Sequence, residues 1–404
     1  MEAPGRIFQL SFLRMKFPFL VRAPKRRDRN KFPLAGQIAI NGDWNNKKRS
    51  RNGGAMCLSD TEKGFQTQKR LNNPSLIGAP KCKDRNKFPL AGTGIGDKNM
   101  TYTGYLFAHF IGEQKDGEQI YFSLSRDGLH WQDLNGGKPV LRSEIGEQGA
   151  RDPFLIRSPW EGRDGSAKYY LIATDLRIEA GKGWEAAQYA GSRDILVWES
   201  DNLAEWKGPA AHTIGVEGAG CVWAPEAIYD EAEDAILVFW ASMVEKKQRI
   251  YAAYTKDFHE FTEPFLFLEK ENHVIDSTII RTEEGYYRYT KDETTKNICV
   301  DFSKTLRPEE FTEVKSETLS CLHGVEGPEI FKFHDREGWC LIVDRFAAHK
   351  GYLPLVTENL ASGEFRILKD SEFDMGATKK RHGGILPITE EEWESLAQGG
   401  GELE

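Results

Sequence analysis

A motif that recurs five times constrains what this chain of 404 residues can fold into. Each copy opens with a polar or small residue and continues as an apolar run, and successive openings start 72, 52, 50 and 56 positions apart. The openings are residues 152–156, 224–228, 276–280, 326–331 and 382–387. A period near fifty indicates a repeat architecture in which each copy is one supersecondary unit.

Two further apolar segments follow each of the first four openings. Both are rich in Ile, Val, Tyr and Phe and are bounded by Asp, Gly and Asn, which is typical of strands in antiparallel hairpins. The second segments are residues 169–175, 236–242, 286–290 and 339–344, and the third are residues 195–200, 250–255, 298–303 and 352–357. The pattern therefore predicts three strands in each copy.

The fifth copy is incomplete, because only a short polar segment, residues 390–404, follows its opening strand. The missing pair of strands is found at the other end of the repeat region, as residues 105–110 and 120–125. A ring that pairs its last strand with its first explains both facts and leaves no open sheet edge between the ends. We predict an all-β fold, a five-bladed β-propeller, with the first strand of each blade lining the axis. The alternative, a β-solenoid or a stack of unrelated hairpins, does not account for the split fifth copy.

The residues before the repeats have the opposite charge balance. Residues 1–98 contain 21 Lys and Arg against 7 Asp and Glu, which is a net charge of +14. Since the whole chain has a net charge of −8, the remaining residues carry −22. Residues 23–36 recur as residues 79–92 with 12 of 14 positions identical, which indicates a duplication. We expect a disordered basic leader at 1–98, a propeller domain at 99–396 and a tail at 397–404. A basic leader can bind nucleic acid, but no base-stacking aromatic pattern accompanies it, and no nucleic-acid partner is predicted.

Cysteine and hydropathy patterns bear on the compartment. The six Cys form no CxxC pair and no evident disulfide framework, which favours a reducing compartment. No run of 18 apolar residues exists, so no membrane partner is predicted. Residues 7–21 make a poor signal peptide, because Arg14 and Lys16 interrupt them. We expect a cytoplasmic protein, with secretion as the alternative if the start of the chain is misassigned.

Three acidic residues stand at the openings of the predicted inner strands, namely Asp152, Asp276 and Glu326. Because inner strands lie side by side around the axis, these carboxylates are expected to meet in one cavity. Their mutual repulsion raises at least one pKa, so that an acid and a base coexist near neutral pH. Hydrolysis of a glycosidic bond needs such a pair, one to protonate the leaving oxygen and one to activate water. Each carboxylate alone is compatible with a turn residue.

The motifs around these residues resemble glycoside hydrolase family 43. The resemblance covers about residues 105–394 and is carried by Arg151-Asp152-Pro153, Trp223-Ala224-Pro225-Glu226, Ile275-Asp276, Glu326-Gly327-Pro328 and Arg381-His382-Gly383. It implies that Asp152 is the general base, that Glu326 is the general acid, and that Asp276 orients the acid and tunes its pKa. It also implies inversion at the anomeric carbon, without a covalent intermediate.

Further residues are candidates for contact with a sugar. Each has an ordinary structural alternative, such as core packing for Trp223 or pairing with an acidic neighbour for the arginines. The predicted substrate-binding residues are Trp223, Glu226, His109, Arg151, Phe346, Arg381 and His382, with Arg345 as a lesser candidate. The resemblance implies a His near the bottom of the pocket, which His382 matches, and in some family members a bound calcium or chloride ion lies beside it. No cofactor is expected to be required and no metal ligand is assigned, because no EF-hand-like set of oxygen ligands is present.

The resulting hypothesis is an inverting glycoside hydrolase that releases terminal α-L-arabinofuranosyl units from plant-type oligo- or polysaccharides. The residue chemistry does not separate this sugar from β-D-xylose, so β-D-xylosidase activity is an alternative. Many family members that act on xylosides carry a C-terminal β-sandwich, which this chain is expected to lack. A carbohydrate-binding propeller without catalysis is another alternative. A retaining fructan hydrolase would need Glu-Cys-Pro where Glu326-Gly327-Pro328 stands.

Overall fold

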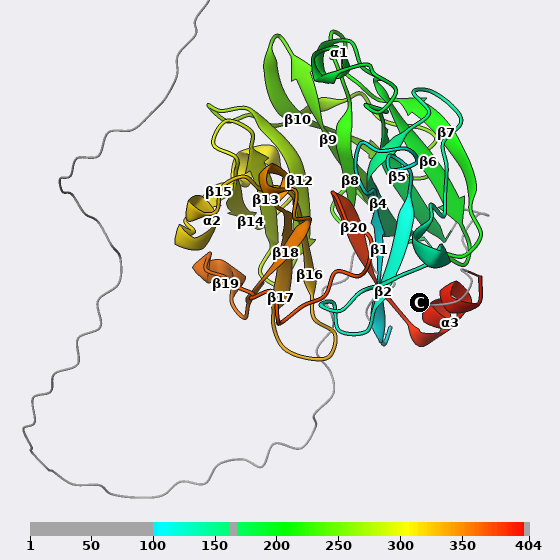
Figure 1. Ribbon diagram of the computed structural model, residues 1–404. Helices are drawn as coiled ribbons and strands as arrows, with labels where there is room; N and C mark the ends of the chain where they lie inside the picture. Colours follow the sequence, from blue (N-terminus) through cyan, green and yellow to red (C-terminus); the bar gives the residue numbers. More distant parts are fainter. Residues whose placement is uncertain (1–99, 161–167, 400–404) are drawn as a thin grey trace, which may run out of the picture. The chain divides into compact units, whose positions relative to one another are not determined.

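The computed structural model describes residues 100–160 and 168–399, which form five four-stranded antiparallel sheets (Figure 1). The five sheets are the blades of a β-propeller, as predicted. The predicted leader at 1–98, including its duplication, lies outside the described residues.

Blade one is assembled from both ends of the repeat region. Its sheet has the order β20-β1-β2-β3, and the last inner strand, β20 (Gly383–Ile388), pairs antiparallel with β1 (Gly104–His109) from Gly104↔Ile388 to His109↔Gly383. The blade is completed by β2 (Tyr121–Ser125) and β3 (Gln132–Asp133). The predicted closure of the ring is therefore confirmed.

The other four blades are each continuous in sequence and are built in the order inner to outer. Blade two consists of β4 (Ala150–Arg157), β5 (Tyr169–Asp175), β6 (Asp194–Ser200) and β7 (Lys207–Thr213). Blade three consists of β8 (Trp223–Asp230), β9 (Ala235–Val244), β10 (Lys247–Thr255) and β11 (Phe265–Leu268). Blade four consists of β12 (Val274–Arg281), β13 (Tyr286–Asp292), β14 (Asn297–Ser303) and β15 (Thr312–Val314). Blade five consists of β16 (Glu326–Lys332), β17 (Trp339–Asp344), β18 (Tyr352–Thr357) and β19 (Arg366–Ile367).

Each blade thus has four strands, one more than predicted. The fourth strands lie at the outer edge of each sheet and are short or exposed; β7, for example, has no buried residue. An outer strand has little core to face, so most of these strands carry no apolar run that marks them in the sequence. The exception is β11, which reads Phe-Leu-Phe-Leu and buries Phe267 and Leu268.

The described residues contain three α-helices: α1 (Trp184–Tyr189) and α2 (Glu317–Cys321) lie in connections, and α3 (Glu390–Gly399) follows β20. Short 3₁₀ helices span Asn135–Gly137, Pro308–Glu310, Phe346–Ala348 and Leu360–Ser362. No helix in residues 100–160 or 168–399 combines the length and hydropathy that crossing a membrane requires.

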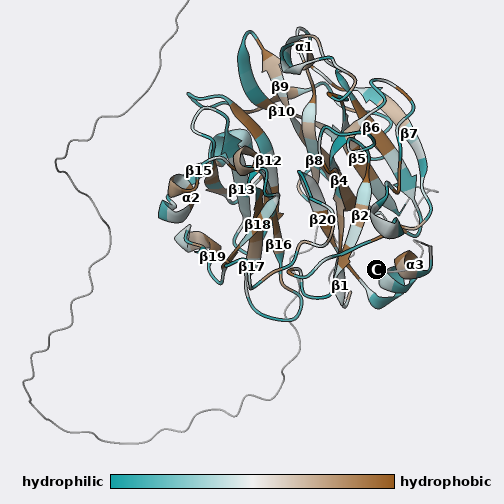
Figure 2. Cartoon of the chain, in the orientation of Figure 1, coloured by the Kyte–Doolittle hydropathy of each residue, from teal (hydrophilic) through white to brown (hydrophobic). Residues whose placement is uncertain are grey.

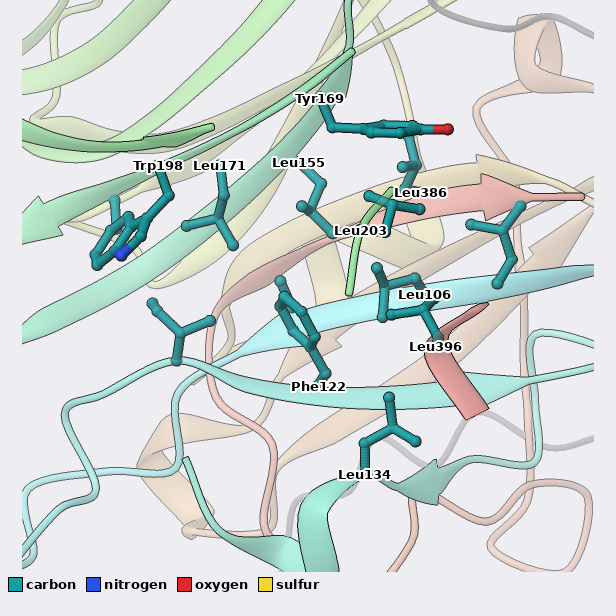
Figure 3. Close-up of a cluster of buried hydrophobic side chains, with 14 of the residues drawn as sticks. Leu106, Phe122, Leu134, Leu155, Tyr169, Leu171, Trp198, Leu203, Leu386 and Leu396 are labelled. Carbon is teal, nitrogen blue, oxygen red and sulfur yellow. The ribbon is translucent and has the colours of Figure 1, made fainter. Parts of the chain in front are cut away.

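The core is divided among the interfaces between blades, which is why strands inside a blade, such as β1, β5 and β9, are buried on both faces. Five buried clusters are present, one between each pair of neighbouring blades. Figure 3 shows the cluster between blades one and two, in which Leu106 and Phe122 meet Leu171 and Trp198. In Figure 2 the hydrophobic residues run along the strands and the hydrophilic ones gather in the connections. Fully burying one such side chain is worth about 1.5–3 kcal/mol, so the packing of blade on blade holds the ring together.

The inner strands β4, β8, β12, β16 and β20 contact one another in a closed ring. The first residues of these strands share one end of the propeller. Since the second strand of each blade runs antiparallel to the first, the second strand ends where the first begins, and the connection to the third strand borders the same end. Two polar strand ends and one loop from every blade therefore meet around the axis.

Candidate active site

A cavity of about 530 Å³ lies at this end of the axis. All three predicted catalytic carboxylates line it, and so do most of the predicted sugar-binding residues. The predicted residues in its wall are Asp152, Asp276, Glu326, Arg151, Trp223, Phe346, Arg381 and His382.

The inner strands β4, β8, β12 and β16 begin with a bulge, which in β4 and β12 turns two consecutive side chains toward the cavity. Asp152, Ala224, Asp276 and Gly327 have φ angles of 48°, 48°, 49° and 51°, and the strand register shifts at each of them. In a regular strand neighbouring side chains point to opposite faces, so such a bulge is needed to re-aim one of them. Asp tolerates the left-handed conformation better than most residues, because its short polar side chain can bond locally.

Asp152, Asp276 and Glu326 were predicted to occupy equivalent positions of the repeat, and the structure corrects this. Glu326 does not share the phase of Asp152 and Asp276, since Gly327 occupies the left-handed position in blade five. Glu326 is instead equivalent to Arg151, Trp223 and Ile275, the residues just before the bulge, and all four line the cavity. The three carboxylates still converge, because both the residue at the left-handed position and the residue before it can face the cavity.

Gly327 is required by a close approach as well as by its φ angle. A Cβ atom at Gly327 would lie 2.7 Å from Cγ of His382. The carbonyl of Gly327 accepts a hydrogen bond of 2.9 Å from the Tyr352 hydroxyl, which itself accepts one of 3.1 Å from the Gly383 amide. The absence of a side chain at Gly327 lets His382 reach the floor of the cavity.

Asp152 is oriented by a threonine of its own blade. The Thr174 hydroxyl donates a hydrogen bond of 3.0 Å to Oδ2 of Asp152 and accepts one of 2.8 Å from the amide of Ala224. On its other side, Oδ1 of Asp152 lies 3.6 Å from Nδ1 of His382. The carboxylate is thereby held between blades two, three and one.

Asp276 is the carboxyl with a raised pKa. Burial is the main cause and raises its pKa to about 6, while His382 and Lys291 oppose the change. Its Oδ2 accepts a hydrogen bond of 3.1 Å from the Gly327 amide, and its Oδ1 lies 3.8 Å from Nδ1 of His382. One carboxyl of the three can therefore hold a proton near neutral pH.

Glu326 behaves in the opposite way. It lies 2.7 Å from Nζ of Lys291 and 2.8 Å from Nη2 of Arg381. Burial favours the neutral carboxyl, but Lys291 and Arg381 outweigh it and hold the pKa of Glu326 below its usual value. In the free protein Glu326 is thus an ionised carboxylate between two cations, although its predicted role is that of an acid.

An aromatic and cationic wall flanks the carboxylates. The Arg151 guanidinium bonds Glu113 and Glu118 at 2.9 and 2.8 Å and lies 4.4 Å from the centre of the Phe110 ring. Trp223 lies in the wall of the cavity, as predicted. Phe346 lies there too, and the Lys291 ammonium is 4.5 Å from the centre of its ring.

Three of the predicted candidates do not line the cavity. His109 is fully buried in blade one, where Nε2 lies 3.0 Å from the Ser123 hydroxyl and the ring stacks on Tyr121. Arg345 holds its own loop by donating to the carbonyls of residues 350, 351 and 352.

Glu226, the third, is buried beside Glu329, away from the cavity wall. It follows the bulge by two residues, so it belongs to a deeper layer of the inner strands. Burial, and then the neighbouring Glu329, raise the pKa of Glu226 well above the usual value. Hydrogen bonding to a sugar, as predicted for Glu226, is therefore not supported by its position.

Sequence reasoning missed Lys291, Glu113 and Trp184, all of which line the cavity. Lys291 ends the second strand of blade four and pairs with Ile275, as Asp344 pairs with Glu326 in blade five. The signal available for Lys291 was its place at the end of a second strand, beside the start of the first. Glu113 and Trp184 lie in connections, where the repeat imposes no pattern.

The neighbourhood of His382 was expected to hold a calcium ion. Within the described ranges, no group of three or more His, Cys, Asp or Glu side chains is placed to hold a metal ion. Calcium at this place stays a prediction.

The known proteins that resemble this chain are glycoside hydrolases. A family profile described as a probable glycosyl hydrolase domain, related to glycoside hydrolase family 43, matches residues 100–394. A curated α-L-arabinofuranosidase of Bifidobacterium longum is 30% identical over an alignment of 295 positions, and the match covers 61% of this chain and 27% of that protein. The chain thus spans about a quarter of the length of this relative.

Solved structures show lower similarity. An endo-1,4-β-xylanase of Bacteroides thetaiotaomicron is 13% identical with a TM-score of 0.46, over 70% of this chain and 94% of that one. An exo-β-1,3-galactanase of Phanerochaete chrysosporium is 15% identical with a TM-score of 0.38, over 52% of this chain and 48% of that one. The five-bladed architecture therefore rests on the strand pairing described above.

Proposed function

We propose a function from the premise that this chain belongs to the glycosyl hydrolase family related to glycoside hydrolase family 43, whose profile covers residues 100–394. The proposed activity is hydrolysis of terminal α-L-arabinofuranosyl units of oligo- or polysaccharides, with inversion at the anomeric carbon. The observation that supports it most is the convergence of Asp152, Asp276 and Glu326 on one cavity, with one raised and one lowered pKa among them. The choice of arabinose is supported by the curated relative, which is an arabinofuranosidase.

In this mechanism Asp152 accepts a proton from a water molecule as the water oxygen bonds to the anomeric carbon. Glu326 donates a proton to the glycosidic oxygen as the bond from that oxygen to the anomeric carbon breaks. Thr174 and His382 keep Asp152 in place for the attack. Such an inverting pair needs about 6.5–9.5 Å between its carboxyl groups, so that the water fits.

The acid step requires a proton that Glu326 lacks in the free protein. Asp276 and Glu326 influence each other's pKa, and Asp276 is the better proton holder while Lys291 and Arg381 face Glu326. We propose that the proton moves to Glu326 when a leaving oxygen occupies the cavity and water is excluded, because the uncharged acid is then favoured. Asp276 is thus assigned the role of tuning the acid.

The first experiment compares hydrolysis of para-nitrophenyl α-L-arabinofuranoside with that of para-nitrophenyl β-D-xyloside by the full chain. Faster release from the arabinofuranoside supports the proposal, whereas faster release from the xyloside makes the chain a β-D-xylosidase. The configuration of the first product, followed by proton NMR, tests inversion. Silence on both compounds together with measurable binding of arabino-oligosaccharides would identify a carbohydrate-binding propeller instead.

Substitution of the acid tests the assignment of roles. Glu326→Gln is expected to lower kcat on arabino-oligosaccharides at least 100-fold, while a substrate whose leaving group needs no proton loses much less. Asp152→Asn is expected to lower the rate on both substrates, with partial rescue by azide. Equal losses on both substrates in Glu326→Gln would remove Glu326 from the acid role.

A further inference from the structure

The longest connection on the cavity side of the propeller belongs to blade two. The second and third strands of this blade are joined by residues 176–193, whereas the corresponding connections of the other blades are residues 110–120, 245–246, 293–296 and 345–351. This connection contains α1, which stands at the top of the view in Figure 1. It also accounts for part of the spacing of 72 residues between the first two repeats.

Helix α1 carries two exposed aromatic side chains, Trp184 and Tyr189, which are 50% and 52% exposed. Among the described residues, no other Trp, Tyr or Phe side chain is exposed. Trp184 lies in the cavity wall, whereas Tyr189, five residues further on, does not. An exposed Trp at the edge of a cavity costs solvation, so it suggests a surface that is covered when a ligand is bound.

The Trp184 ring is held in place from one side. It packs edge-on against Trp223, with ring centres 6.1 Å apart and planes at 85°, and the Arg151 guanidinium lies 5.0 Å from its centre. Arg151 itself is fixed by Glu113 and Glu118. Because the ring is ordered before any ligand arrives, binding to it costs little side-chain entropy.

The backbone of the connection is anchored as well. The Gly191 amide donates a hydrogen bond of 2.7 Å to the Gly220 carbonyl, and the Val222 amide donates one of 3.1 Å to the Ser192 carbonyl. Ala187 of α1 is fully buried, and Lys182 pairs with Glu147. The connection is thus a fixed part of the rim between blades two and three.

We propose that Trp184 is a stacking platform for a sugar unit that adjoins the one being cleaved. The ring of a neutral pyranose has an apolar C–H face that suits an aromatic surface, and no charged partner is needed. On this reading, which rests on the proposed function, the substrate is a side-chain unit attached to a main chain of sugars, and the main chain crosses the mouth of the cavity over Trp184.

The test compares a substrate with a main chain and one without. Trp184→Ala is expected to lower kcat/KM about tenfold on an arabinofuranosyl-substituted xylo-oligosaccharide and to leave kcat/KM on methyl α-L-arabinofuranoside, whose leaving group has no ring to stack, within about twofold. Trp184→Phe should restore most of the loss, since it keeps an aromatic face. Tyr189→Ala is the matched control, because it removes an equally exposed aromatic ring of α1 from outside the cavity, and it should change neither rate.

Three results would overturn the inference. An equal loss on both substrates in Trp184→Ala would mean that Trp184 acts on the cleaved sugar or on Arg151, and equal loss in Tyr189→Ala would mean that α1 acts only as structure. No loss on either substrate would mean that nothing stacks on Trp184.

A binding titration separates this inference from the proposed function. If the full chain hydrolyses neither substrate, the proposed function fails, and calorimetric titration with the same oligosaccharide then decides the inference. A Kd about tenfold weaker in Trp184→Ala, with Tyr189→Ala unchanged, supports the platform without catalysis. Equal Kd values, or no binding by the unmodified chain, overturn it.

Discussion

Two carboxyls in the wall of the cavity, those of Asp276 and Glu326, have pKa values that move in opposite directions. Burial dominates at Asp276, whereas at Glu326 the charges of Lys291 and Arg381 outweigh it. Lys291 is itself almost completely buried, and although burial disfavours its charge, the carboxylates around it raise its pKa. The charge state of Glu326 is therefore controlled by a residue that the motif comparison did not include.

Lys291→Met tests this control. The variant removes one of the two cations beside Glu326 while keeping a side chain of similar length, so the pKa of Glu326 should rise. If Glu326 is the acid, its protonated form then persists to higher pH, and the alkaline limb of the kcat/KM profile should move upward by about one pH unit. The profile is measured with an arabino-oligosaccharide, whose leaving group needs the proton.

Lys379→Met is the control for this experiment, because it removes an exposed lysine from the rim of the same cavity. Its alkaline limb should stay in place. An unmoved limb in Lys291→Met would indicate that another group limits the rate at high pH.

Among the elements, the inner strands are joined by buried polar contacts beneath the cavity. Glu329 of β16 accepts a hydrogen bond of 3.2 Å from the Thr278 hydroxyl of β12 and one of 2.8 Å from the Ile385 amide of β20. Glu226 of β8 lies in the same layer. Burial raises the pKa of Glu329 to about 8, so a neutral carboxyl connects three inner strands at physiological pH.

This carboxyl predicts a pH dependence of stability. Between the usual glutamate pKa near 4.5 and the folded value of about 8, the unfolded chain has lost the proton that the folded chain retains. The free energy of unfolding should therefore fall as the pH rises from 5 to 8, by on the order of 3 kcal/mol from this group. Glu329→Gln cannot titrate, so its stability should fall less over this range.

Urea denaturation at pH 5 and pH 8 measures the difference. Glu313→Gln, on the exposed outer strand β15, should keep the pH dependence of the unmodified chain. A slope that is unchanged in Glu329→Gln would show that Glu329 is ionised in the folded protein.

How well each element was predicted follows from its place in the blade. The first three strands of each blade are packed on both faces, so their apolar runs give positions close to the observed ones; β5, for instance, was predicted at 169–175 and spans Tyr169–Asp175. Most outermost strands were missed because they are short or exposed, and β11, although apolar, spans only Phe265–Leu268. Helix α3 was missed because its first turn is Glu390, Glu391 and Glu392, which in sequence reads as a polar tail.

At the scale of the whole molecule, α3 contacts both blade one and blade two beside the strand pairing that closes the ring. It follows β20 directly, and its Leu396 packs into the cluster between blades one and two. Glu392 accepts two hydrogen bonds from Arg157 of blade two, at 2.8 and 3.0 Å, and both side chains are buried. Glu390 pairs with Arg126 of blade one at 2.6 Å, but both of these side chains are about half exposed.

The two ion pairs of α3 should differ in their contribution to stability. Glu392→Gln removes the carboxylate charge that faces the buried Arg157 and is expected to lower the free energy of unfolding by about 3 kcal/mol. Glu390→Gln, two residues away on the same helix, should cost less than about 1 kcal/mol, because solvent screens an exposed pair. Urea denaturation measures the free energy of unfolding of both variants. Similar losses in the two would contradict the view that α3 stabilises the ring mainly through Arg157.

The candidate site was predictable to the extent that it follows the repeat. Asp152, Asp276 and Trp223 were found because they recur at strand openings, and the ring brings those openings together. His109 and Glu226 were misplaced, since sequence does not show which of two nearby positions on a strand faces the cavity. The pKa of Glu326 could not be foreseen, because Lys291 comes from a different strand and Arg381 from a different blade.

The order in which the strands occur along the chain has a consequence for biosynthesis. Arg381 and His382 immediately precede β20, which is the last strand of the propeller in chain order and the one that completes blade one. A nascent chain that has emerged from the ribosome only as far as β19 holds Asp152, Asp276 and Glu326 but cannot yet enclose them. The wall of the cavity is complete only when Arg381, His382 and β20 have been made, so a chain released before that point carries the three acidic groups without part of the wall around them.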